Sequence, residues 1–316
     1  MIRTAGPEPE PIPVTTTARP EVPYFPPQGG RFRMALGLKV LADADWIEID
    51  AAFADDLAEK QRLIEADRAA VFQALPDSLP AQREFLDHLT DHLCRYHGPS
   101  FRRQDGGVHV APTGRLVVPD PDAPLLAAAA LVQEDVLLLQ PGTDGAFRLV
   151  AGLLAFPTRW SLAAKMGRPL AAIHAPVPGY GAHLERPMDR LFAGLRPGRL
   201  LWRSNWSLLD DPALHQPGGH GSGTAGRMLD AATVGERLWF RVERQTLGLL
   251  PDTGTAVFTV RIHQARLQDR VRTVAEARDM RDAILEMPEE MRRYKSMPGF
   301  LAALLEWLEE HTRQVK

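Results

Sequence analysis

The chain has 316 residues, of which 45% are hydrophobic and 24% are charged, so it is long enough to bury a sizeable core as one large or two smaller domains. Its 37 Lys and Arg residues are balanced by 40 Asp and Glu residues, which leaves no basic field to hold a nucleic-acid backbone. A single cysteine, Cys94, excludes internal disulfides and a zinc-finger framework, so any metal would be held mainly by His, Asp or Glu.

Apolar stretches in the sequence are short. None approaches the roughly 20 residues of a membrane-spanning helix, and the N-terminus lacks the charged start and apolar core of a signal peptide. We therefore expect no membrane and no nucleic acid among the partners, and a cytoplasmic location.

Proline dominates the beginning of the chain. Residues 1–30 contain eight of the 27 prolines, mixed with Glu, Thr and Gly, a composition that cannot repay the entropy lost on folding. We predict a disordered Pro-rich tail over 1–30. Residues 31–100 then have helical spacing of apolar residues and are predicted as a helical N-terminal region.

After residue 100 the pattern changes to short apolar segments separated by Pro- and Gly-containing turns, which is typical of hairpins. The elements predicted in chain order are helices over 53–75 and from 80 to 97, hairpins over 108–118 and 135–156, a helix over 161–166, a loop over 173–180, strands over 199–205, 238–245 and 256–263, a loop over 210–230, and helices over 274–286 and 298–311. Hairpins bracketed by helices, without strict alternation of strand and helix, predict an α+β fold with an antiparallel sheet.

Two motifs in the sequence could indicate other chemistry. Residues 221–226 match G-x-G-x-x-G, but no strand precedes them as a dinucleotide site requires, so we interpret them as a loop. His88 and His92 are four residues apart on a predicted helix, as zinc ligands are, yet Leu89 stands where a zinc protease has its catalytic Glu. A solvated helix face is the simpler interpretation, and a non-haem metal enzyme using this pair is an alternative.

The remaining candidates lie in the middle and late parts of the chain. His174 precedes Pro176-Val177-Pro178, and two prolines restrict how this loop can move. Arg241, Glu243 and Gln245 alternate along a predicted strand and therefore share one face, which is either solvent-exposed or part of a polar pocket.

Taken together, these segments resemble the alpha subunit of the haem-dependent oxidative N-demethylase family. The similarity covers roughly residues 31–266. Four groups of residues carry it, in this order: Pro157-Thr158-Arg159-Trp160 with Lys165-Met166-Gly167; Ile173-His174-Ala175-Pro176-Val177-Pro178; Arg203-Ser204-Asn205-Trp206; and Glu243-Arg244-Gln245-Thr246-Leu247 with Leu250-Pro251, Thr253-Gly254 and Phe258-Thr259-Val260-Arg261.

The resemblance implies a PAS-like antiparallel sheet with flanking helices that binds haem b. We accordingly expect a PAS-like haem-binding region over 101–266 and C-terminal helices over 267–316. The implied activity is that of a monooxygenase that uses O2 to demethylate a small secondary amine such as dimethylamine and releases formaldehyde. Electrons would come from NADPH through partner reductase subunits carrying flavin and an iron–sulfur centre.

The resemblance also suggests roles for individual residues. His174 is the expected axial ligand of the haem iron, because neutral imidazole suits iron. Arg203 and Arg261 are expected to bind the cofactor, and Arg241 is a further candidate for its propionates. Glu243 and Trp206 are expected around the amine, which needs an anion or an aromatic face, so that Glu243, Trp206 and Arg241 form the expected catalytic group.

Two alternatives remain beside this one. A thiolate ligand would have to be Cys94, which lies outside every matched segment. A haem-binding PAS-like sensor or carrier without turnover would share the fold and the cofactor, because fold alone does not imply function.

Overall fold

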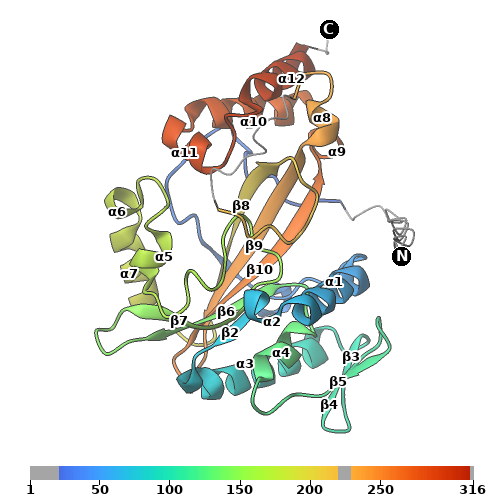
Figure 1. The fold of residues 1–316 in the computed structure, drawn as a ribbon, viewed down its shortest axis with the longest axis vertical. Coiled ribbons are helices and arrows are strands. Elements are labelled where there is room, and N and C mark those ends of the chain that lie inside the picture. Colours follow the sequence, from blue (N-terminus) through green and yellow to red (C-terminus); the bar gives the residue numbers. More distant parts are fainter. Residues whose placement is uncertain (1–20, 220–228, 314–316) are drawn as a thin grey trace, which may run out of the picture.

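The fold is described by a computed structural model that covers residues 21–219 and 229–313. Most of the predicted tail and all of the Gly-rich motif at 221–226 lie outside the described residues. Figure 1 shows a long, twisted sheet with helices around it.

A seven-stranded antiparallel sheet forms the centre of the molecule, in the order β1-β8-β9-β10-β6-β7-β2. Its strands are β1 (Lys39–Leu41), β2 (Phe72–Ala74), β6 (Asp135–Pro141), β7 (Phe147–Leu153), β8 (Leu200–Leu209), β9 (Trp239–Leu249) and β10 (Ala256–Arg266). If the five strands β6 to β10 are numbered 1 to 5 along the chain, their order across the sheet is 2-1-5-4-3. Helices are inserted in the chain between the second and the third of them, β7 and β8. This is the PAS-like α+β arrangement that was expected.

Local sequence explains the two long hairpins. The turn at Pro251-Asp252-Thr253-Gly254 joins β9 to β10, with Gly254 at φ +63°, a conformation that favours glycine. Strand β6 is apolar on both sides: Val136 and Leu138 belong to one core cluster, and Leu137 and Leu139 to another. Helices must therefore cover both faces of the sheet.

Two groups of helices cover these two faces, and a third group packs at one end of the long strands (Figure 1). One face is covered by α1 (Phe53–Ala66), α3 (Leu79–Tyr96) and α4 (Pro124–Ala129), and the other by α5 (Leu170–His174), α6 (Tyr180–His183) and α7 (Glu185–Ala193). The third group packs against the far ends of β8 and β9 and consists of α8 (Val234–Arg237), α9 (Leu267–Arg270), α10 (Val274–Glu286), α11 (Glu289–Tyr294) and α12 (Leu301–Arg313).

A small sheet of β3 (Phe101–Gln104), β4 (Gly107–Val110) and β5 (Arg115–Val117) packs beside α3 and contains the predicted hairpin around residue 112. Between α3 and this sheet lies a cavity of about 470 Å³, lined by residues that include Thr90, Arg103 and Val117. It contains no histidine and none of the predicted site residues.

Two predicted helices differ from the structure. The helix predicted over 53–75 ends at Ala66, because Asp67 leaves helical geometry and accepts a hydrogen bond from the backbone N–H of Ala70 at the start of α2 (Arg68–Val71). Phe72 then pairs with Leu153 in the sheet. Residues 163–167 form turns instead of the predicted helix, and Gly167 at φ +71° returns the chain to strand β7.

The end of the predicted tail is also different. Residues 21–30 pack against the protein: Val22 is only 3% exposed, and the ring of Phe25 lies 5.8 Å from that of Phe240. The backbone N–H of Gly29 donates to Asp279 on α10 at 2.9 Å. Apolar side chains between the prolines provide the burial that the composition argument overlooked.

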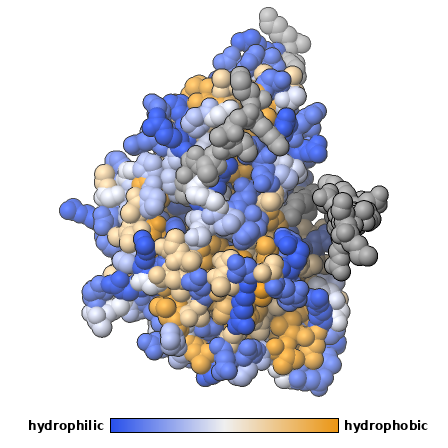
Figure 2. All heavy atoms as spheres, in the orientation of Figure 1, coloured by the Kyte–Doolittle hydropathy of each residue, from blue (hydrophilic) through white to orange (hydrophobic). Residues whose placement is uncertain are grey.

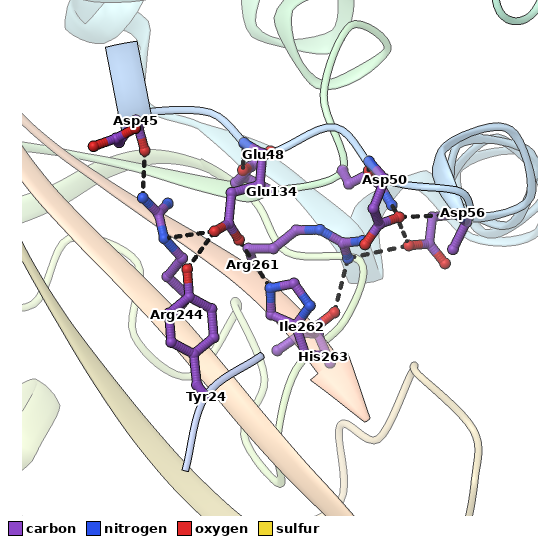
Figure 3. A network of polar contacts seen from close by, with 12 residues as sticks. Tyr24, Asp45, Glu48, Asp50, Asp56, Glu134, Arg244, Arg261, Ile262 and His263 are labelled. Atoms are coloured by element: carbon purple, nitrogen blue, oxygen red, sulfur yellow. Dashed lines mark hydrogen bonds and ion pairs between the residues drawn. The ribbon is translucent and has the colours of Figure 1, made fainter. Parts of the chain in front are cut away.

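A buried network of charges attaches the chain from Tyr24 to Asp56 to strands β9 and β10 (Figure 3). Glu48 pairs with Arg244 at 3.2 Å and with His263 at 2.9 Å, and also accepts a hydrogen bond from the Tyr24 hydroxyl. Burial opposes the ionisation of Glu48, but the hydrogen bond from His263 and the charge of Arg244 hold its pKa below the usual value.

On the face drawn in Figure 2, hydrophilic residues surround smaller groups of apolar ones. Among the described residues, no helix is both long enough and apolar enough to cross a membrane.

Candidate functional site

His174 is the last residue of helix α5, and not part of a loop as predicted. Its ring stacks on the buried ring of Tyr180, with the centroids 5.1 Å apart and the planes inclined by 10°. The chain between them turns at Gly179, whose φ of +74° opens helix α6. The prolines at 176 and 178 restrict this turn, so the imidazole is held from both sides.

The protonation of His174 follows from its neighbours. Its Nδ1 lies 2.9 Å from the carbonyl oxygen of Leu170, and since a carbonyl can only accept, Nδ1 carries the hydrogen. The lone pair is therefore on Nε2. Burial lowers the pKa of His174, and the charges of Lys165 and Arg203 lower it further, so the ring is neutral at pH 7. A neutral imidazole oriented through Nδ1 is the form that binds a metal.

Strands β8 and β9 provide the second part of the site. Arg203 is directly opposite Gln245, and Asn205 is directly opposite Glu243, so these four side chains share one face. Leu247, further along the same face of β9, packs in the cluster that contains α5 and α7. The predicted alignment of Glu243 and Gln245 on one face is confirmed. Helix α5, which ends at His174, packs on this same face.

Glu243 is held by its neighbours on this face. Gln245 donates from Nε2 to Oε2 of Glu243 at 2.9 Å, and Asn205 donates from Nδ2 to the same oxygen at 3.4 Å. These two amides fix the carboxylate by one oxygen.

Three cations surround Glu243. Burial lowers the pKa of Lys165 and of Lys295 to about 8 each, and it also lowers the pKa of Arg203, while the charge of Glu243 opposes all three shifts. Within 21–219 and 229–313, no other carboxylate acts on their pKa values. Tyr294 faces the same carboxylate, and burial together with that charge raises its pKa to about 12.

This charge balance fits a dianionic ligand beside His174. Three cations and one carboxylate leave two positive charges, and haem b carries two propionates. The Nε of Arg203 is buried and has no hydrogen-bond partner in the described part of the chain. A buried donor atom without a partner costs free energy unless a ligand satisfies it. The donor set and the imidazole therefore suit haem b.

Two of the residues expected at the catalytic centre lie elsewhere. Trp206 alternates with Asn205 and so faces the opposite side of the sheet, where it packs 5.9 Å from Phe240. Arg241 shares the face of Glu243, but its guanidinium is fully buried and donates to the carbonyl oxygens of Phe156 and Leu214. The structure does not bring either side chain to Glu243.

Arg261, expected at the cofactor, lies on the opposite face from His174. Its guanidinium is buried between Asp50 at 2.7 Å and Asp56 at 3.1 Å (Figure 3). Both carboxylates come from the N-terminal region, so Arg261 joins that region to β10.

The two histidines of the alternative metal site lie in different environments. His88 is exposed on α3, whereas His92 is buried against Trp46, and burial lowers the pKa of His92 to about 4. No group of three or more His, Cys, Asp or Glu among the described residues could hold a metal ion. Cys94 is on the same helix, which packs on one face of the sheet, whereas α5 with His174 packs on the other.

Sequence reasoning missed Lys165, Asn205, Lys295 and Tyr294 as members of the site. Composition contains a signal for three of them, because the chain has only five lysines and Asn205 is its only asparagine. Because lysine is rare in this chain and arginine is common, Lys165 and Lys295 could have been singled out as candidates. Tyr294 has no comparable signal.

A comparison with protein families gives one match across this geometry. The model described as haem-dependent oxidative N-demethylase, alpha subunit-like, matches residues 37–305. The match includes His174, the strands with Arg203 and Glu243, and helix α11 with Lys295.

Proposed function

This chain belongs to the haem-dependent oxidative N-demethylase, alpha subunit-like family, and on that premise we propose that it is the haem-binding subunit of a monooxygenase that demethylates a small secondary amine such as dimethylamine. The observation that supports this most directly is a neutral, Nε2-available His174 on the sheet face that also carries the charged group around Glu243.

In this proposal His174 binds the haem iron through Nε2, and the Leu170 carbonyl keeps the imidazole in the required tautomer. Arg203 and the neighbouring lysines neutralise the propionates. Arg241 and Arg261 are left to structural roles, since their guanidinium groups already bond to protein oxygens.

Glu243 binds the amine. A secondary ammonium ion carries N–H donors, and Glu243 is the carboxylate that acts on all three cations of this group. Because Gln245 and Asn205 both donate to Oε2, Oε1 is the oxygen available to the amine. The aromatic contact expected from Trp206 is not required.

Haem, when bound, supplies the oxygen-activating chemistry. In the overall reaction, dimethylamine, O2, NADPH and a proton give methylamine, formaldehyde, water and NADP⁺. The oxidised carbon leaves as formaldehyde when the C–N bond of the N-hydroxymethyl amine breaks. We infer that the electrons enter through reductase subunits with flavin and iron–sulfur centres, as the alpha-subunit character of the family suggests.

The first experiment is the visible spectrum of the purified chain titrated with haem. We expect one equivalent to give a Soret band that is lost in His174→Ala and restored there by added imidazole, which replaces the missing ligand. Cys94→Ser and His183→Ala are the controls, because Cys94 lies on α3 and His183 is exposed.

A band that survives in His174→Ala without imidazole would place the ligand elsewhere. Absence of a band in the unchanged protein would reject the haem function itself.

Turnover separates the enzyme from a sensor. The haem-loaded chain, supplied with a reductase and NADPH, should release formaldehyde in proportion to added dimethylamine. Haem binding with no amine-dependent formaldehyde and no spectral response to any secondary amine would favour a PAS-like sensor or carrier.

A further inference from the structure

Lys295 joins the C-terminal helices to the sheet. It follows helix α11 directly, and its ammonium group donates to Trp206 O at 2.6 Å and to Asn205 Oδ1 at 3.3 Å. No carboxylate lies within ion-pair distance of it in the described residues. The ammonium also lies 5.6 Å from the centroid of the Trp206 ring, so its contacts in the described residues are a carbonyl oxygen, an amide and an aromatic ring.

The amide of Asn205 can have only one orientation between its two neighbours. Lys295 can only donate, so the atom facing it must be the oxygen, and ionised Glu243 can only accept, so the atom facing it must be the nitrogen. The ammonium and the carboxylate thus hold the amide from its two ends, the ammonium at the oxygen and the carboxylate at the nitrogen. Without the ammonium, the oxygen loses its charged donor, and the orientation of the Asn205 side chain relative to Glu243 depends on the 3.4 Å hydrogen bond alone.

The backbone beside Lys295 is held in a strained conformation. Ser296 has φ +59°, which is uncommon for a residue other than glycine, and it ends α11 with the bonds Ser296 N to Arg293 O and Met297 N to Arg292 O. Its hydroxyl accepts a hydrogen bond from Arg159 at 2.9 Å, and Arg159 also has a positive φ, of 61°. Such strain persists where the surrounding structure enforces it, often at a functional site.

We propose that Lys295 is a positioning residue for the amine site: through Asn205 it holds the Glu243 carboxylate in the orientation that binds substrate. The substrate part of this inference rests on the proposed function. The series of hydrogen bonds from Lys295 through Asn205 to Glu243 does not depend on it.

The charge of Lys295 has an effect of its own, opposite in sign. A cation beside Glu243 competes with the substrate ammonium, so a purely electrostatic role predicts that removing Lys295 strengthens amine binding. A positioning role predicts that it weakens binding. The other charged or titratable groups facing this carboxylate are Lys165 from the turn before α5, Arg203 on β8 and Tyr294 on α11.

The spectroscopic test uses the full chain without added haem. Labelling with ¹⁵N-asparagine gives one side-chain amide signal, because Asn205 is the only asparagine. Lys295 loses its proton near pH 8, so the signal should move with an apparent pKa of about 8 between pH 6.5 and 9.5. The movement should vanish in Lys295→Met and persist in Lys165→Met, whose ammonium donates to Ile173 O and not to Asn205. Persistence in Lys295→Met, or no movement in the unchanged chain, would overturn the proposal.

The binding test uses the haem-loaded chain and dimethylammonium, followed by calorimetry. We expect Lys295→Met to bind about tenfold more weakly, and Lys295→Arg, which keeps the charge and the donors, to recover most of the loss. Lys39→Met, at an exposed lysine on β1, is expected to bind as well as the unchanged protein. Tighter binding by Lys295→Met would overturn the positioning role, whereas failure of every variant to bind amine, with the ¹⁵N result intact, would reject the proposed substrate alone.

Discussion

At the scale of single residues, Glu243 is where the charges of the site meet. Its carboxylate accepts two amide hydrogen bonds and offsets three cations that have no other carboxylate acting on them in the part of the chain described. Replacing Glu243 by Gln keeps the shape but removes the charge. The substrate ammonium then loses its anionic partner, while the cations stay beside it.

We therefore predict that Glu243→Gln weakens dimethylammonium binding by about 10- to 100-fold, the equivalent of a lost charged hydrogen bond of about 1.5–3 kcal/mol. Haem content should not fall, because His174 is untouched and the surplus positive charge favours propionates. Amine titration of the haem-loaded variant measures this. Glu290→Gln, an exposed change on α11, is the control. Unchanged amine affinity in Glu243→Gln would remove Glu243 from the substrate site.

At the scale of elements, the sequence predicted what is encoded locally. The hairpins at 135–156 and 238–263 were predictable because Gly- and Pro-containing turns separate apolar runs, and their pairing is confirmed. The three-residue strands β1 and β2 were not, because each is defined only by a partner far along the chain. The same applies to the site: the alternation of Glu243 and Gln245 is a local pattern, but the approach of Lys295 depends on tertiary packing.

Residues 21–30 give an element-scale prediction. A chain truncated to start at residue 31 should be less stable to urea than one that starts at residue 21, by about 3 kcal/mol or more. Full burial of a Val side chain alone contributes about 1.5–3 kcal/mol, and the truncation also removes the Tyr24 and Phe25 contacts. Equal unfolding midpoints for the two proteins would show that this segment does not stabilise the fold.

At the scale of the whole molecule, the network in Figure 3 couples stability to pH. Burial raises the pKa of Asp50, but the charge of Arg261 and the hydrogen bond from Gln133 outweigh it and leave the pKa below 3.8, and that of Glu48 is likewise below its usual 4.5. The unfolded chain therefore takes up protons on these groups first as the pH falls. Their stabilisation is complete above about pH 5 and is lost as the pH falls through the folded pKa values.

The variant Glu48→Gln should show this directly. At pH 7 we expect a loss on the order of 2 kcal/mol, at the low end for a buried pair because a quarter of the side chain is exposed. The difference from the unchanged protein should shrink between pH 5 and pH 3, and comparing the two proteins cancels the contribution of the other carboxylates. Urea unfolding across this range measures the difference. A difference that is constant with pH would show that Glu48 does not carry its charge in the fold.

The pairing of Arg261 with Asp50 and Asp56 also limits when these contacts can form during synthesis. These acids precede their partner by 211 and 205 residues. Strand β1 likewise pairs with a strand far along the chain, with Lys39 opposite Trp202 of β8. On a ribosome adding about 5–20 residues per second, that separation corresponds to roughly 10–40 s. During this interval Asp50 and Asp56 lack the native contact with Arg261. The loop that carries these acids is thus synthesised early and reaches its contact with Arg261 late, and β10 is also the strand that joins β9 to β6.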